Sequence, residues 1–212
     1  GSMSRVAVVT GGTSGIGLAT ANALKDAGVK VYVLSRHAAE LPGLFHIAAD
    51  VSNEESVAAA IHEVHRREGR LDILVNNAGF GISGAAEFTE NADAKRLLDV
   101  NLFGMVNATK AALPLMRAQG GGRIVNVSSV AAPLSIPFQA WYSVSKAAVN
   151  AYTLALFNEV KQMGVSVCAV MPGDIHTGFT AARKKCPAGD DVYAGRIARS
   201  VAKMEKDEEN GM

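Results

Sequence analysis

Short apolar runs rich in β-branched residues alternate with longer segments of helical periodicity along this chain. The apolar runs predict strands at residues 5–10, 30–35, 44–49, 71–76, 122–127 and 165–171. Each run is apolar on both faces, which is typical of parallel strands that have helices on both sides. The periodic segments predict helices over residues 16–27, 54–67, 91–118 and 140–163, with Ser52 and Glu55 as a capping box before the second. The pattern therefore predicts an α/β fold, with a doubly wound parallel sheet between two layers of helices.

The connection between the second and third predicted strands is unusually short. Residues 36–44 leave room for at most one helical turn, and Pro42 and Gly43 interrupt this stretch. Neighbouring parallel strands normally need a crossover of a dozen or more residues, usually a helix. We therefore expect this crossover helix to be shortened or lost. The remaining pattern predicts one domain over residues 3–212, with Gly1 and Ser2 left over from a purification tag.

The composition is that of an ordinary globular protein, with 49% hydrophobic and 19% charged residues among 212. Its 21 basic and 20 acidic side chains are scattered and give a formal net charge of +1, so no basic surface for nucleic acid or an anionic membrane is expected. No apolar run approaches the roughly 20 residues that span a bilayer, and no signal sequence is recognisable. We expect a cytoplasmic protein with Cys168 and Cys186 as reduced thiols. Its five histidines form no ligand set, so no metal is expected.

A glycine-rich turn follows the first predicted strand at residues 10–17, TGGTSGIG. The spacing of Gly11, Gly15 and Gly17 allows the backbone to turn sharply and lets a phosphate group approach the N-terminus of the next helix. A tight strand-to-helix turn could carry the same glycines without binding anything. Because this one lies between a first strand and an amphipathic helix, the sequence predicts a dinucleotide-binding site.

Five further motifs follow in order: NNAG at residues 76–79, Asn101, Ser129, YSVSK at 142–146 and PGDIHT at 172–177. With the glycine-rich turn, they resemble the short-chain dehydrogenase/reductase family over nearly the whole chain. The resemblance implies a Rossmann-type fold and reversible hydride transfer between a nicotinamide cofactor and a carbonyl or secondary alcohol. Relatives usually continue into a further helix and strand, which this chain is expected to lack. The strand at 165–171 would then lie at an edge of the sheet.

Tyr142 and Lys146 are four residues apart at the start of a predicted helix, so both project from one face. A free tyrosine is a poor base at neutral pH, and an adjacent ammonium group favours its phenolate form. By resemblance, Tyr142 transfers a proton to or from the substrate oxygen and Lys146 also binds the nicotinamide ribose. Ser129, which has the family's separation from the tyrosine, polarises the carbonyl. Asn101, a poor helix former inside a predicted helix, holds a water near Lys146.

Ser35 and Arg36 end the second predicted strand, where an NAD-binding enzyme usually carries an acidic residue. The guanidinium group of Arg36 suits a 2'-phosphate, so NADP(H) is favoured and NAD(H) stays possible. Against this, Ser14 stands where many NADP-dependent relatives carry a basic residue. The resemblance places these residues around the cofactor: Gly11, Thr13, Ser14, Gly15, Ile16, Gly17, Ser35, Arg36, Asp50, Val51, Asn77, Ala78, Gly79, Tyr142, Lys146, Pro172, Gly173, Ile175 and Thr177.

Residues expected near the reacting centre are mostly apolar, among them Phe80, Phe138 and Trp141, which suits a ketone, aldehyde or secondary alcohol on a hydrophobic body. Two other functions stay open. A non-catalytic NADP(H) sensor or scaffold is expected to have lost the serine, tyrosine or lysine. A sugar-nucleotide epimerase or dehydratase is expected to have GxxGxxG spacing and a larger C-terminal region. By resemblance, the two long helices over 91–118 and 140–163 form a homodimer contact.

Overall fold

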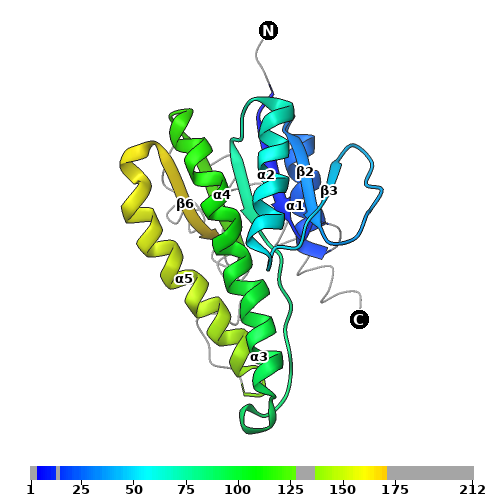
Figure 1. The fold of residues 1–212 in the computed structure, drawn as a ribbon, viewed down its shortest axis with the longest axis vertical. Helices are drawn as coiled ribbons and strands as arrows, with labels where there is room; N and C mark the ends of the chain where they lie inside the picture. The colour runs from blue at the N-terminus through cyan, green and yellow to red at the C-terminus, as the bar shows by residue number, and fades with distance from the viewer. Residues whose placement is uncertain (1–3, 13–14, 128–136, 171–212) are drawn as a thin grey trace.

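The structure is a computed structural model that describes residues 4–12, 15–127 and 137–170. Its centre is a sheet of six parallel strands in the order β3-β2-β1-β4-β5-β6, which confirms the predicted doubly wound fold (Figure 1). The strands are β1 (Val6–Thr10), β2 (Lys30–Ser35), β3 (Phe45–Ala48), β4 (Ile73–Asn76), β5 (Gly122–Val127) and β6 (Val165–Val170). The strand order reverses between β1 and β4. Open α/β sheets bind their ligands at the carboxyl ends of strands beside such a reversal.

Helices cover both faces of the sheet (Figure 1). They are α1 (Gly15–Asp26), α2 (Glu54–Glu68), η1 (Ala86–Phe88), α3 (Asn91–Leu98), η2 (Asp99–Phe103), α4 (Gly104–Ala118), α5 (Ala140–Val160) and η3 (Lys161–Met163). Consecutive strand residues bury their side chains in two separate apolar clusters. Val8 and Leu74 lie in the cluster with α2, α4 and α5, while Val9 and Val75 lie in the cluster with α1. This two-sided burial explains why the strands are apolar throughout.

The helix α2 begins at a different cap from the one that the sequence predicts. Asn53 is its N-cap, and the Asn53 Oδ1 accepts a hydrogen bond from the backbone N–H of Ser56 at 2.9 Å. The predicted capping box of Ser52 and Glu55 is therefore wrong. The Ser52 hydroxyl is used elsewhere, because it donates to Asp50 Oδ1 at 2.7 Å. Asp50, two residues before Ser52, therefore binds the hydroxyl group that was predicted to cap the helix.

The short connection between β2 and β3 is confirmed, since the structure has no helix between Ser35 and Phe45. Leu41 and Leu44 from this connection pack against the cluster beneath α1. Lys25 of α1 donates a hydrogen bond to the Pro42 carbonyl at 3.3 Å, which holds the loop to that helix. Two leucines and one lysine contact therefore cover sheet surface that a crossover helix would otherwise cover.

The helix predicted over residues 91–118 has the predicted extent but is not uniform. Between α3 and α4 the backbone forms a π-helical segment, η2, and Asn101 is buried at its centre. A π-helical turn carries an extra residue, so it rotates the side chains that follow it, and such turns are frequent at functional sites. The poor helix propensity of Asn101 therefore coincides with a real irregularity of the backbone.

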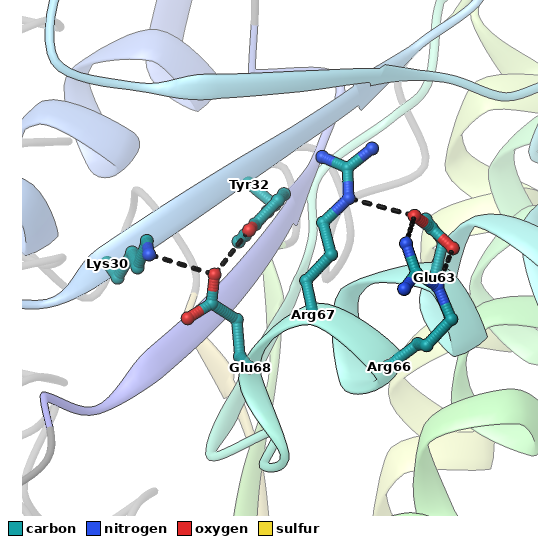
Figure 2. Close-up of polar contacts among 6 residues, drawn as sticks. All are labelled: Lys30, Tyr32, Glu63, Arg66, Arg67 and Glu68. Carbon is teal, nitrogen blue, oxygen red and sulfur yellow. Dashed lines mark hydrogen bonds and ion pairs between the residues drawn. The ribbon is translucent and has the colours of Figure 1, made fainter.

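A polar network joins β2 to α2 at the amino end of the sheet (Figure 2). It consists of Lys30, Tyr32, Glu63, Arg66, Arg67 and Glu68. The buried Tyr32 hydroxyl donates a hydrogen bond to Glu68, and Lys30 pairs with the same carboxylate at 2.9 Å. Beyond it, Arg66 and Arg67 both bind Glu63. The basic groups of this network therefore all have acidic partners.

The strand β6 forms one edge of the described sheet and pairs only with β5 there. Cys168, buried on this strand, is disulfide-bonded, so the prediction of a reduced thiol is wrong. Spacing along the chain could not reveal this, because a disulfide depends on the approach of two Cβ atoms in the fold. The expected lack of a C-terminal helix and strand concerns residues outside the described ranges and stays a prediction.

Candidate active site

The predicted motifs meet at the carboxyl ends of β1, β2 and β4, which lie at the lower end of the sheet in Figure 1. Parallel strands all end at the same edge, so loops that are far apart in the sequence become neighbours there. The N-termini of α1 and α5 and the π-helical segment lie at this edge too. The topology therefore gathers the glycine-rich turn, the NNAG loop, Asn101 and the YSVSK segment.

The described glycines of the glycine-rich turn leave room for a phosphate group. Gly15 has φ +56, and a Cβ built there would meet nothing within 4 Å, so the turn is open on that side. A Cβ on Gly17 would lie 2.2 Å from the Gly11 carbonyl oxygen, so only glycine allows α1 to approach the turn this closely. Because the open side lies at a helix N-terminus, the residues present fit the pyrophosphate of a dinucleotide.

Thr10 holds the NNAG loop against this turn. Its Oγ1 accepts hydrogen bonds from the backbone N–H groups of Asn77 at 3.0 Å and Ala78 at 3.2 Å. In return, the Asn77 side chain donates to the Gly11 carbonyl at 3.2 Å. Two predicted cofactor-binding segments are thereby fixed to each other by three hydrogen bonds. Thr10 was not among the predicted site residues, although this threonine is the first residue of the motif.

A pocket of about 290 Å³ lies between the ends of β2, β3 and β4. Seven predicted cofactor-binding residues line it: Gly11, Ser35, Arg36, Asp50, Val51, Ala78 and Gly79. Hydrogen bonds from Ser52 lower the pKa of the Asp50 carboxyl group, with smaller contributions from the positive charges of Arg36 and Arg96. Arg96 and Val100, from α3 and the π-helical segment, also line the pocket but were not predicted. Its place and its lining suit the adenosine half of a dinucleotide.

Asn101 connects the loop that follows β4 to α5. Its Oδ1 accepts from the Phe80 backbone N–H at 2.9 Å, and its Nδ2 donates to the Phe80 carbonyl at 2.7 Å. Nδ2 also lies 3.4 Å from the hydroxyl of Ser145 on α5. The side-chain amide is thus used to hold two backbone segments together. Ser145, which is fully buried and donates to the Tyr142 carbonyl at 2.7 Å, was missed as a member of this contact.

Tyr142 and Lys146 lie on one face of α5, as the sequence predicts. The Lys146 Nζ lies 5.7 Å from the centre of the Tyr142 ring. Only 6% of Lys146 is exposed, and burial lowers the pKa of its ammonium group to about 8. Among the described residues no carboxylate forms an ion pair with it. The charge of Lys146 is therefore available to a neighbouring phenolate or to a bound ligand.

Seven predicted site residues lie outside the described ranges: Thr13, Ser14, Ser129, Pro172, Gly173, Ile175 and Thr177. The residues that sequence reasoning missed are Thr10, Arg96, Val100 and Ser145. Thr10 could have been found, because a threonine directly before the glycines ends the strand. Arg96 and Ser145 carry no such signal, since only the packing of α3 and α5 decides what they face.

A larger hollow, of about 700 Å³, lies at the opposite, amino end of the sheet. It is lined by the turns that precede β4, β5 and β6, and none of the predicted motifs contributes to it. Size alone therefore does not identify the site. The smaller pocket is the better candidate, because Gly11 of the glycine-rich turn, Arg36 and Arg96 line it.

Within residues 4–12, 15–127 and 137–170, no helix is long and apolar enough to cross a membrane. No group of three His, Cys, Asp or Glu side chains in these ranges could hold a metal ion. The predicted catalytic residues that lie within these ranges are Asn101, Tyr142 and Lys146.

Comparisons with known proteins show the family of this chain and agree with its fold. A family model described as short chain dehydrogenase matches residues 5–187. The chain is 40% identical to the 3-ketodihydrosphingosine reductase of Bacteroides thetaiotaomicron, over 98% of this chain and 78% of that protein. The crystal structure of 3-ketoacyl-(acyl-carrier-protein) reductase from Brucella melitensis complexed with NADH is 33% identical, with a TM-score of 0.76 over 80% of this chain and 76% of that one. NAD+-bound xylitol dehydrogenase is 32% identical, with a TM-score of 0.75 over 79% and 69%.

Proposed function

Because the chain belongs to the short-chain dehydrogenase family, we propose that it transfers a hydride between a nicotinamide cofactor and the carbonyl or secondary alcohol of a hydrophobic substrate. The observation that carries this proposal is the buried Lys146 beside Tyr142 on one face of α5. A buried ammonium group without a carboxylate partner among the described residues is costly for folding, so a role in the reaction explains its presence.

When bound, the nicotinamide supplies or accepts the hydride, and the protein handles the proton. In the direction of reduction, Tyr142 gives its hydroxyl proton to the substrate oxygen as charge develops there. In oxidation, the phenolate takes that proton back. Lys146 stabilises the phenolate through its positive charge, and Ser129 is proposed to donate a hydrogen bond to the same substrate oxygen.

Asn101 is proposed to keep Tyr142 and Lys146 supplied with protons through a bound water. A cavity of about 10 Å³ lined by Asn76, Asn101 and Lys146 supports this, because it has room for one water molecule. Asn76 Oδ1 is buried there and has no hydrogen-bond partner among the described residues, so it offers a water an acceptor. The side-chain amide of Asn101 is occupied by Phe80, so it supports the cavity wall.

NADP(H) is the proposed cofactor, in preference to NAD(H). Arg36 lines the adenosine pocket, and the described residues provide no acidic side chain at the end of β2 that could accept from a ribose 2'-OH. Two solved relatives are described with NAD+ or NADH bound, so family membership does not decide the preference. The proposal rests on the charge of the pocket in this chain.

A ketone attached to an apolar body is the proposed substrate. Two relatives are named for the reduction of keto compounds, 3-ketodihydrosphingosine and 3-ketoacyl-(acyl-carrier-protein). In this chain Phe138 precedes the catalytic helix, is 65% exposed and has a left-handed backbone with φ +66. Its carbonyl accepts from the Gly84 N–H at 2.9 Å. An aromatic side chain held in a strained backbone beside Tyr142 suits contact with an apolar substrate.

We also propose a homodimer through α4 and α5. Val144 and Leu154 on α5 are 48% and 69% exposed, and Phe103, directly before α4, is 50% exposed. Large exposed apolar side chains on α5 and on η2, which contacts α5, suit an interface. Light scattering should give the mass of two chains. Leu154→Arg is expected to yield a folded monomer, and an unchanged dimer would place the interface elsewhere.

The non-catalytic sensor remains the second candidate, and one assay separates it from the enzyme. Absorbance of the reduced nicotinamide is followed while ketones and alcohols of increasing apolar size are added with NADP(H) or NAD(H). The proposal expects turnover that is faster with NADP(H) and with the larger apolar ketones. Cofactor binding without turnover on any compound would instead support the sensor. Tyr142 and Lys146 are present, which argues against a protein that has lost its chemistry.

A further inference from the structure

Two arginines from different elements line the adenosine pocket. Arg36 follows β2, and Arg96 comes from α3, one helical turn before Val100, which also lines it. In the part of the chain that the structure describes, neither guanidinium group has an ion-pair partner. The arginines of the amino-end network differ, because Arg66 and Arg67 both bind Glu63. Unpaired arginines that border one pocket indicate an anionic ligand.

Asp50 is the acidic residue of this pocket, and its charge would repel a phosphate group. Ser52 fixes its carboxylate with two hydrogen bonds, from the backbone N–H at 3.0 Å and from the hydroxyl at 2.7 Å. With Arg36 and Arg96 the pocket lining holds two guanidinium groups and one carboxylate, an excess of one positive charge. Without Arg96, Arg36 and Asp50 would leave no excess. Arg96 therefore determines whether the pocket attracts an additional anion.

The hydroxyl group of Ser35 is already in use, although its position beside Arg36 suggests a phosphate contact. Its Oγ lies 2.9 Å from the His37 carbonyl and 2.6 Å from His46 Nε2. A serine hydroxyl has a single proton, which is donated either to the carbonyl or to the imidazole. Ser35 would have to give up one of these bonds to donate to a phosphate. Recognition of an anion is thus left to the guanidinium groups.

We propose that Arg96 is a second cofactor-recognition residue, whose charge acts with that of Arg36 to favour the 2'-phosphate of NADP(H). The inference rests on the proposed nicotinamide cofactor and deepens its NADP(H) preference. Arg96 lines the same pocket as Arg36, and the charges of both lower the pKa of Asp50, so the two guanidinium groups act on the same space. Salt screens such interactions between charges. The effect of Arg96 should therefore weaken when salt is added.

The test compares binding of 2',5'-ADP and 5'-AMP to the full chain by titration calorimetry. These two probes differ in the 2'-phosphate alone. Arg96→Gln should weaken 2',5'-ADP by about tenfold at low salt and leave 5'-AMP within about twofold. Lys95→Gln is the matched control, because it removes the same charge from the neighbouring residue of α3, which does not line the pocket. It should leave both affinities unchanged.

The outcomes separate the inference from the proposed function. If wild type prefers 2',5'-ADP and Arg96→Gln keeps the full preference, the inference is overturned and the NADP(H) preference stands on Arg36. Equal weakening of both probes also overturns it, since Arg96 would then act on the part that the two probes share and not on the 2'-phosphate. A wild type that binds the two probes equally overturns the NADP(H) preference itself, and the inference with it.

Discussion

Tyr32 and Tyr142 each lie near a lysine, at opposite ends of the parallel sheet. At the amino end, the Tyr32 hydroxyl donates to Glu68, and Lys30 pairs with that same carboxylate at 2.9 Å (Figure 2). At the carboxyl end, Tyr142 lies beside the buried Lys146, which has no carboxylate partner among the described residues. The same two residue types therefore meet very different electrostatic surroundings.

The difference shows what the fold adds to residue identity. Burial and the negative charge of Glu68 raise the pKa of Tyr32, so that phenol keeps its proton and serves as a structural donor. Lys30 cannot stabilise a phenolate there, because its ammonium group is paired with the Glu68 carboxylate. Lys146 is free of such a partner within the described ranges. A tyrosine near a lysine is thus a candidate for proton transfer only where no acid intervenes.

The largest expected effect comes from removing the two hydroxyl groups in turn. Tyr142→Phe should lower turnover by about two orders of magnitude or more and leave cofactor binding intact, because only the proton-transferring group is lost. Tyr32→Phe is the matched control, and its turnover should stay near that of wild type. Steady-state kinetics on one good ketone measure both. Near-normal turnover in Tyr142→Phe would remove this tyrosine from the proposed mechanism.

Lys146→Met should also abolish most activity, by about a hundredfold, and it sharpens the comparison through pH. In the folded state the pKa of Lys146 lies near 8, below its usual value of 10.5. Between these two values the unfolded chain binds more protons than the folded one, so wild-type stability gains a contribution as pH rises through this window. The same contribution is lost as pH falls through about 8.

The measurement is the free energy of unfolding in urea at pH 7 and pH 10, for wild type and Lys146→Met. The difference between the two proteins should shift in favour of wild type at the higher pH. Lys30→Met provides the control, because Lys30 is partly exposed and paired with Glu68. An identical pH dependence of Lys146→Met and wild type would mean that the ammonium group is hydrated in solution.

Arginines at the two ends of the sheet differ in the same way, because Arg66 pairs with Glu63 while Arg36 has no ion-pair partner among the described residues. Replacing Arg36 should have a smaller effect than replacing Tyr142 or Lys146. Arg36→Asp should shift the NADPH to NADH ratio of kcat/KM towards NADH by about tenfold or more, because a carboxylate repels the 2'-phosphate and accepts from a 2'-OH. Arg66→Gln, at the paired amino end, should leave that ratio alone. If Arg36→Asp also leaves it unchanged, Arg36 faces solvent and the proposed pocket charge is irrelevant to cofactor choice.

The sequence predicts those parts of the molecule that depend on local pattern. All six strands follow from runs that are apolar on both faces, and five of them are buried as such runs require, while the edge strand β3 is only partly buried. The pairing of Tyr142 with Lys146 follows from the spacing of one helical turn. The short loop after β2 follows from length alone, since residues 36–44 cannot form a crossover helix and return to the sheet.

Features that depend on tertiary contact escaped prediction. Asn53 rather than Ser52 caps α2, because Asp50 binds the Ser52 hydroxyl. Arg96 lines the pocket beside Arg36 only because the fold brings α3 close to the loops that follow β3 and β4. Cys168 is disulfide-bonded although its sequence context gives no sign of it. At each of these positions the local sequence permits more than one arrangement, and a contact with another residue determines which one forms.

The smallest expected effect concerns the structural tyrosine. Tyr32→Phe should lower the free energy of unfolding at pH 7 by about 1 to 2 kcal/mol, because it removes one hydrogen bond to a charged group while Lys30 still pairs with Glu68. Tyr32 lowers the pKa of Glu68, so the bond contributes stability above the usual pKa of that carboxyl group and loses it as pH falls through the lowered value. Urea unfolding of wild type and variant should therefore differ at pH 7, and the difference should shrink as the pH is lowered and Glu68 becomes protonated. Tyr32→Phe keeps the ring that stacks on Phe45 at 5.0 Å, so a gap that persists in acid would show that the hydroxyl group stabilises the fold independently of the Glu68 charge, and the contrast with Tyr142 would then not rest on that carboxylate.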